Sequence, residues 1–338
     1  MDAQSDPDIR FDDKGVCNYC RAALRAQNQH RIDQDNLPWV IDGIKKRGRC
    51  IIGLSGGVDS SYALHVLRQH GVDVVAYTID NGWNTPVADE NIMKLVEGMK
   101  VPFFRYTINR ERFHELQRSF IQSGVPNIEI PSDHLITSVA WDMAKRDKVK
   151  TIISGGNWQT ESIMPAVFGY SAVDLYHIQQ IYKQFTGKRL KGLPTTNLAQ
   201  YMWYRCVKRI KIVNLLDHVD YNREKAQERL AKLYGWKPYG AKHEESYFTD
   251  WFQALYLDYK FGLDKRRPHL SSMIHSGQMT RQEALGIVRV PATCKLASAQ
   301  AVYKVFGARI ANVATHWHSD YPTHERLRKW AHKIYRHF

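Results

Sequence analysis

The chain has 338 residues, 43% hydrophobic and 24% charged, a composition typical of a folded globular protein. Its 48 lysines and arginines outnumber 34 acidic residues, and the formal net charge of +14 predicts an anionic partner. Five cysteines in a chain of this size exclude a disulfide-rich scaffold, and no apolar run is long enough to cross a bilayer.

The chain begins with the acidic, polar stretch MDAQSDPDIRFDDKG, which does not resemble a signal or transit peptide. We therefore expect a cytoplasmic protein with no membrane insertion. We expect three parts: an N-terminal segment over 1–40, an α/β domain over 41–240 and a helical C-terminal region over 241–338.

Strands and helices alternate through the first half of the chain. The strand at 72–79 is nearly all apolar, as expected for a parallel strand covered on both faces. The order of elements predicts an α/β fold with a doubly wound, mainly parallel sheet. The expected strands are 49–54, 72–79, 102–108, 149–156 and 210–217, and the expected helices are 27–46, 60–70, 87–98, 111–122 and 133–147.

Three of these strands end in polar or glycine-rich turns, at 55–60, 80–82 and 154–157. In a doubly wound sheet, ligands bind beyond the carboxyl ends of the strands. The three turns therefore predict one nucleotide site.

The first turn, within LSGGVDSS, has the residue types of a phosphate loop but lacks the lysine of G-x-x-x-x-G-K-[ST]. Gly56 and Gly57 let backbone N–H groups approach phosphate oxygens, and Ser55 and Ser60 add hydroxyl donors. The start of the following helix adds partial positive charge. Asp59 would repel phosphate, so it suggests Mg²⁺ or a helix cap. A ligand-free glycine turn with such a cap is the alternative.

LSGGVDSS resembles the pyrophosphate loop of the PP-loop ATP pyrophosphatase superfamily, which includes asparagine, GMP and NAD synthetases and the tRNA thiolation and lysidine enzymes. The resemblance implies a HUP-like fold of the adenine nucleotide alpha-hydrolase type over 41–240. It implies ATP cleavage to AMP and pyrophosphate, through an adenylated oxygen that a nitrogen or sulfur nucleophile displaces. Asp80 and Asn81 would then lie near the adenosine, and Gly155, Gly156 and Asn157 would form a second loop facing the phosphates.

Longer stretches resemble the N-acetyl sugar amidotransferases of bacterial surface-polysaccharide synthesis, including those of lipopolysaccharide O-antigen. They are SDPDIRFDDKGVCNYC, TIDNGWNTPVADENI, IISGGNWQTES and the segment 242–285. That family converts an acetamido group on a nucleotide-activated sugar into an acetamidino group. ATP adenylates the amide oxygen, and ammonia then displaces AMP.

The source of ammonia is predicted to be a separate protein. None of the five cysteines lies on a tight elbow between small residues, and position 2 is Asp, so neither known type of glutaminase site is present. The resemblance implies two partners, similar to the glutaminase and cyclase subunits of histidine biosynthesis.

Further candidates lie beyond the phosphate loop. Glu161 would coordinate Mg²⁺ or touch the acceptor, unless it is an exposed helix cap. His243 and Glu244 belong to a dense polar cluster that enters an aromatic stretch, and we expect them in the acceptor site. Lys265 and Arg266 suit stabilisation of departing pyrophosphate, against the alternative of a solvated basic turn.

Two sets of residues have a structural alternative. Cys17 and Cys20 resemble half of a four-cysteine zinc site, which Cys206, Cys294 or a histidine would have to complete; otherwise no zinc is bound. Four aromatic residues at helical spacing suit a core better than a sugar platform; these are Tyr247, Trp251, Tyr256 and Tyr259.

Two other functions remain open at this point. A tRNA-modifying enzyme of the same superfamily would use the +14 charge. Thiolation, however, usually needs a cysteine pair in the active site, and Cys17 and Cys20 precede the nucleotide fold, so a nucleic-acid partner is not expected. The second alternative is a nucleotide-binding sensor without catalysis.

Overall fold

A computed structural model of the chain describes residues 6, 8–165, 168, 170–240, 242–310, 312–316 and 320–327, without the side chains of 26 and 29–34. None of the helices in these ranges is both long and apolar enough to span a membrane.

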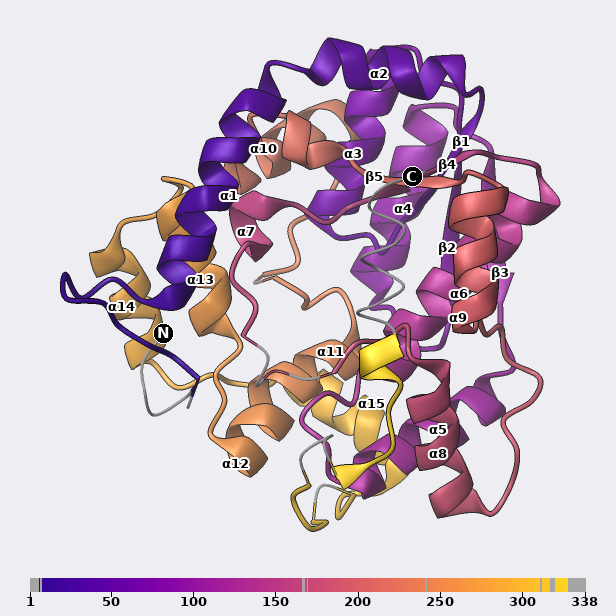
Figure 1. Cartoon of the computed structure of the whole chain (residues 1–338), viewed down its shortest axis with the longest axis vertical. Helices are drawn as coiled ribbons and strands as arrows, with labels where there is room; N and C mark the ends of the chain where they lie inside the picture. The colour runs from indigo at the N-terminus through magenta and orange to yellow at the C-terminus, as the bar shows by residue number, and fades with distance from the viewer. Residues whose placement is uncertain are drawn as a thin grey trace.

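The chain contains a five-stranded parallel sheet with the order β3-β2-β1-β4-β5, whose strands are labelled in Figure 1. The predicted doubly wound α/β class is therefore confirmed. The strands are β1 (Cys50–Gly53), β2 (Val74–Asp80), β3 (Phe103–Thr107), β4 (Thr151–Ser154) and β5 (Lys211–Asn214).

The helices of the first half lie close to the predicted ranges, but two segments differ. The segment expected as one helix at 27–46 is two helices, and Pro38 stands at the start of the second. The last predicted strand is shorter, because 215–218 form a 3-10 turn, η3 (Leu215–His218). The helices are α1 (Asn18–Gln34), α2 (Leu37–Lys46), α3 (Val58–Gln69), α4 (Pro86–Gly98), α5 (Arg110–Ser123), α6 (Ile130–Arg146) and α7 (Trp158–Glu161).

Helices dominate the second half of the chain, as predicted. Two π-helical segments, η2 (Trp203–Val207) and η4 (Phe252–Tyr256), interrupt longer helical runs. The others are α8 (Leu175–Thr186), α9 (Leu198–Met202), α10 (Arg223–Tyr234), α11 (Tyr247–Trp251), α12 (Leu257–Phe261), α13 (Arg266–His275), α14 (Arg281–Arg289) and α15 (Leu296–Phe306). A capping box begins α14, where Thr280 and Glu283 bond each other's backbone N–H.

Both faces of the sheet are buried, because successive side chains of a strand point to opposite sides. Ile51 and Val75 belong to the hydrophobic cluster on one face, and Cys50 and Val74 belong to the cluster on the other. This arrangement leaves the ends of the strands as the places where polar groups gather.

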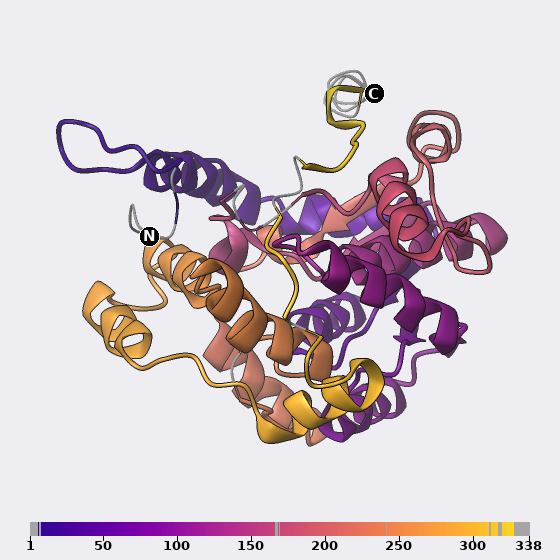
Figure 2. The ribbon, with the colours of Figure 1, turned by 90° about the horizontal axis from the view of Figure 1, so that it is seen from below.

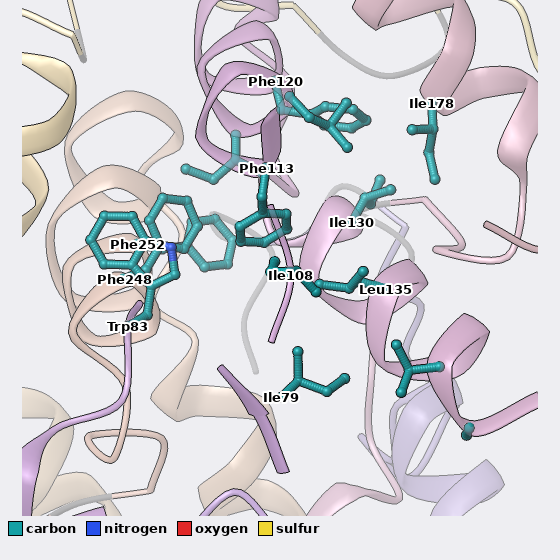
Figure 3. Packing of buried hydrophobic residues seen from close by; sticks show 14 of the residues in the cluster. Ile79, Trp83, Ile108, Phe113, Phe120, Ile130, Leu135, Ile178, Phe248 and Phe252 are labelled. Carbon is teal, nitrogen blue, oxygen red and sulfur yellow. The ribbon is translucent and has the colours of Figure 1, made fainter. Parts of the chain in front are cut away.

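The C-terminal helices share one of these clusters with the sheet domain. Phe248 packs on Trp83, with ring centroids 5.3 Å apart, and Phe252 belongs to the same cluster (Figure 3). Trp251 and Tyr256 are fully buried, whereas Tyr259 is 73% exposed. Seen from below, the orange helices form one side of the molecule (Figure 2). The aromatic stretch therefore contributes mainly to the core.

A short bridge fixes the segment before α11 against the end of β2. The backbone N–H of Thr85 donates to the Glu245 carbonyl (3.0 Å), and that of Tyr247 donates to the Trp83 carbonyl (2.8 Å). This pairing brings residues 242–245 to the carboxyl edge of the sheet, beside the phosphate loop.

Candidate functional site

A cavity of about 300 Å³ lies at the carboxyl ends of the central strands. The phosphate loop after β1, the end of β2 and the glycine turn after β4 line it, together with Tyr239, Lys242, His243 and Glu245. The three strand ends that the sequence singled out thus meet at one cavity.

The phosphate loop is shaped by its glycines. Gly56 has a φ of +80°, and a Cβ there would lie 2.4 Å from the Ala88 carbonyl oxygen. Gly57 is the N-cap of α3, and no side chain caps that end of the helix. The loop's backbone and the first turn of α3 are therefore suited to an anion.

The two glycine-bearing turns touch each other. A Cβ on Gly155 would lie 3.1 Å from the Ser60 backbone nitrogen, so a larger residue would push the turns apart. Gly155 and Gly156 line the cavity, as do Ser55 and Ser60. Asn157 is not among the lining residues; its side chain caps α7 by accepting from the backbone N–H of Thr160 (2.9 Å).

Lys242 forms ion pairs with both carboxylates that the sequence analysis proposed as Mg²⁺ ligands, Asp59 and Glu161. Its Nζ lies 3.2 Å from Asp59 Oδ2 and 2.8 Å from Glu161 Oε1, and it donates to Thr160 Oγ1 (2.7 Å). The hydroxyl of Tyr221 donates to the other Asp59 oxygen. One cation can thus contact both carboxylates, which suits the oxygen ligands that Mg²⁺ prefers.

Charge and burial shift the pKa values of the neighbouring groups. Burial lowers the pKa of Lys242, but the charges of Asp59 and Glu161 more than offset this and raise it. Burial raises the pKa of Glu245 to about 7. Burial, with the charge of Lys242, holds the pKa of His243 well below its usual range. The cavity wall therefore combines a charged lysine with a neutral imidazole.

At the end of β2, the two predicted residues are placed differently. Asn81 lines the cavity. Asp80 is not among the lining residues, and both its carboxylate oxygens accept from Arg110 at 2.6 Å. The end of this strand therefore offers the cavity an amide side chain rather than a carboxylate.

A second cavity, of about 520 Å³, adjoins the first and is lined mostly by the C-terminal region. Lys242 and His243 line both cavities. His243 has a φ of +73°, a backbone conformation that only a few per cent of non-glycine residues adopt. Such strain often accompanies functional sites.

The remaining predicted residues line this second cavity. Glu244 pairs with Lys295, and Arg266 pairs with Asp264 at 2.8 Å. The ammonium of Lys265 lies 2.9 Å from Met164 Sδ and 4.7 Å from the Phe168 ring centroid. Lys265 and Arg266 are thus not brought to the phosphate loop, where their predicted role with pyrophosphate would place them.

The predicted cysteine pair is close but incomplete as a metal site. Cys17 Sγ and Cys20 Sγ are 3.2 Å apart. Across the described part of the chain, no group of three or more histidine, cysteine or acidic residues is placed to hold a metal. Cys294 lies near Asp250 instead, with its Sγ 3.9 Å from Oδ2. The described residues therefore provide no closed zinc site.

Several site residues were missed by sequence reasoning. Lys242 and Tyr239 line the first cavity, and His269 lines the second. Lys242 directly precedes the predicted polar cluster of His243, Glu244 and Glu245, so proximity to that cluster was an available signal. Nothing in the sequence near His269 indicates that it is a site residue.

Two family profiles match parts of the chain. The profile of the LPS biosynthesis protein WbpG-like C-terminal domain matches residues 245–330. That of the tRNA methyl transferase HUP domain matches 48–97, which contain β1, the phosphate loop, α3 and β2. These matches support the PP-loop ATP pyrophosphatase superfamily.

Among curated proteins, the chain is similar to a tRNA-specific 2-thiouridylase of Geobacillus kaustophilus, with 31% identity over 22% of this chain and 23% of the relative. It is similar to the tRNA(Ile)-lysidine synthase of Chlamydia pneumoniae, with 32% identity over 23% of this chain and 25% of the relative. The chain thus spans about a quarter of the length of these relatives. A solved NAD+ synthetase from Burkholderia pseudomallei aligns over 83% of this chain and 94% of its own, at 13% identity and a TM-score of 0.39.

Proposed function

We propose that the protein is the synthetase subunit of an ATP-dependent sugar amidotransferase of surface-glycan biosynthesis. It would convert an acetamido group of a nucleotide-linked sugar into an acetamidino group. One observation carries this proposal. A cavity on a phosphate loop shares a wall, Lys242 and His243, with a cavity built mainly from the segment that the WbpG-like profile matches.

In this proposal the first cavity holds ATP. Backbone N–H groups of the phosphate loop and the start of α3 bind the β and γ phosphates, with Ser55 and Ser60 as further donors. Asp59 and Glu161 would hold Mg²⁺; this is supported by one ammonium that lies within 3.2 Å of both carboxylates. When bound, the metal would neutralise charge on the phosphates.

The second cavity would hold the acceptor sugar. The amide oxygen of the acetamido group attacks the α-phosphorus, an O–P bond forms, and the bond to the β-phosphate breaks to release pyrophosphate. Ammonia then forms a C–N bond at the imidate carbon, and the C–O bond to AMP breaks. Lys242, at the shared wall, is placed to stabilise negative charge on the phosphates.

Ammonia would come from a partner glutaminase through a cyclase-like subunit. Among the described residues that line either cavity there is no cysteine to act as a glutaminase nucleophile. The same observation weighs against a thiolation enzyme. The curated tRNA-modifying relatives match less than a quarter of the chain.

The test is an acceptor screen. The protein is incubated with ATP, Mg²⁺, ammonium and UDP- or CMP-linked N-acetyl sugars, and AMP, pyrophosphate and the acceptor mass are measured. We expect AMP to form only with an acceptor, whose mass falls by the difference between oxygen and an imino NH. Glutamine should not replace ammonium. If none of these acceptors is adenylated, the proposal is contradicted. Tight, salt-sensitive tRNA binding would favour the tRNA-modifying alternative.

A further inference from the structure

His269, one of the residues that line the second cavity, has a buried and unused hydrogen-bond acceptor. It lies on α13, is 8% exposed, and its Nδ1 is 3.1 Å from the Thr160 carbonyl oxygen. A carbonyl oxygen only accepts, so Nδ1 carries the proton and Nε2 offers a lone pair. No hydrogen-bond partner for Nε2 is found among the described residues. A buried acceptor in this state is costly unless a ligand satisfies it.

The surroundings restrict what that ligand can be. Lys242 and Lys265 line the same cavity, and burial with their charges lowers the pKa of His269 to about 3. The positive charges disfavour a cation at Nε2. The described residues include no cluster of three or more metal-ligating side chains. The complementary partner is therefore a neutral N–H or O–H group.

A short chain of contacts connects this acceptor to the phosphate loop. The Thr160 residue whose carbonyl accepts from His269 also accepts from Lys242 through its hydroxyl, at 2.7 Å. Lys242 in turn contacts Asp59 at 3.2 Å. The ring centroids of His269 and His243 are 5.2 Å apart, and His243 faces both cavities. A group bound to Nε2 thus lies near the wall between the cavities.

The adenylation step makes the amide N–H a stronger hydrogen-bond donor. When a secondary amide oxygen forms a bond to the α-phosphorus and pyrophosphate leaves, the amide nitrogen keeps its proton and positive charge develops on it, which favours an acceptor beside the N–H. A trans amide has its N–H and C=O on opposite edges. Binding the N–H therefore directs the oxygen away from the imidazole and leaves it free to react.

We propose that Nε2 of His269 accepts a hydrogen bond from the N–H of the acceptor's acetamido group, and that this bond strengthens as the oxygen is adenylated. This inference rests on the proposed function and adds to it the residue that selects a secondary amide. An acceptor whose acetamido nitrogen is methylated would lack the N–H and would not be adenylated efficiently.

The test compares three variants. H269N keeps a donor toward the Thr160 carbonyl but removes Nε2, whereas H269Q retains an acceptor near the Nε2 position. H65N is the matched control, because His65 is 1% exposed and its Nδ1 lies 2.8 Å from the Tyr234 hydroxyl. Its Nε2 also lacks a hydrogen-bond partner among the described residues. Unlike His269, His65 lines neither cavity.

Acceptor-dependent AMP formation is measured for each variant, alongside ATP binding. We expect H269N to lose roughly 10- to 100-fold in rate, as for an unmade buried hydrogen bond. ATP affinity should be unchanged, H269Q should recover part of the loss, and H65N should match the wild type. N-methylation of the acetamido nitrogen should slow the wild type but have little further effect on H269N. Equal rates for H269N and wild type, or equal sensitivity of both to N-methylation, would overturn the inference.

A second readout does not depend on turnover. With isotope-labelled histidine, N-methylacetamide should shift the His269 Nε2 resonance, and N,N-dimethylacetamide, which lacks the N–H, should not. If no acceptor is turned over by the wild type, the proposed function fails. The amide titration then still decides the inference, because equal responses to both amides, or none to either, would refute it.

Discussion

The two adjoining cavities are built in different ways. The first is formed by backbone turns at the ends of parallel strands, where glycines let chain segments approach closely. The second is formed by side chains of helices that lie far apart in the sequence, from Thr160 to Thr293. Backbone cradles depend on a few short local patterns, whereas side-chain cavities depend on the packing of whole helices.

This difference predicts how each cavity responds to substitution. A single Cβ in the backbone cradle should abolish its function. In the second cavity, the loss of one side chain should reduce activity in graded steps. The following changes test that contrast, from the largest expected effect to the smallest.

Gly56→Ala should have the largest effect. The new Cβ would lie 2.4 Å from the Ala88 carbonyl oxygen, at a φ of +80°. We expect ATP-dependent AMP formation to fall by roughly 100-fold or more, as displaced binding groups lose their alignment. Gly48→Ala is the matched control, with a φ of +85° but nothing within 4 Å of the Cβ. Its cost should be limited to about 1 kcal/mol of stability. An equal loss of AMP formation in both variants would show that backbone strain, and not the contact with Ala88, causes the loss.

Lys242→Met removes the cation from the shared wall. Asp59 and Glu161 would then face each other without it, and we expect the free energy of unfolding to drop by about 1–3 kcal/mol without divalent ions. Mg²⁺ should stabilise this variant more than the wild type, because the ion no longer competes with an ammonium. Thermal unfolding with EDTA and with Mg²⁺ measures both effects.

Arg49→Met is the control for that experiment. It breaks an ion pair with Asp73 whose side chains are 54% and 57% exposed, and such pairs contribute about 0–1 kcal/mol. An Mg²⁺ response no larger in Lys242→Met than in the wild type would argue against a metal at Asp59 and Glu161.

Glu245→Gln should change the pH dependence of stability. Burial raises the pKa of Glu245 from 4.5 to about 7, so between these values the folded state binds more protons than the unfolded state. Stability therefore falls as pH rises across that range. Glutamine cannot titrate, and the decline should shrink by about 1–2 kcal/mol. Urea unfolding at intervals across that range measures it. An unchanged profile would show that Glu245 does not contribute.

Thr280→Ala should have the smallest effect. It removes the capping box of α14, which costs about 1 kcal/mol. Because α14 contributes Ile287 to the second cavity, acceptor turnover should weaken slightly at raised temperature while ATP binding stays constant. A larger effect on ATP binding than on acceptor turnover would contradict the separation of the two cavities.

The backbone-built part of the site was predictable from the sequence. A buried strand, two glycines and a helix start are local signals, and they placed Ser55, Gly57, Asp59, Ser60 and Gly155 at the same cavity. The parallel sheet followed from the alternation of apolar strands and helices. Asp80 and Asn157 were exceptions: Asp80 pairs with Arg110 because of where α5 begins relative to β2, and Asn157 caps α7.

The side-chain-built part was only partly predictable. The cluster at His243 and Glu244 was found, but its neighbour Lys242 was not assigned a role. His269 and Lys265 reach their positions because α13 packs against α7, a contact between residues about a hundred positions apart. The predicted role of Lys265 with pyrophosphate assumed a position that this packing does not provide.

The most direct test of the account follows the amide oxygen. If the acetamido oxygen of an acceptor carries a heavy isotope, the account predicts that the label appears in the phosphate of AMP, because that oxygen bonds to the α-phosphorus and leaves with it. The product should lose the label in equal amount. AMP without the label, or a product that retains it, would show that the amide oxygen in the second cavity does not react with ATP in the first, past Lys242 and His243.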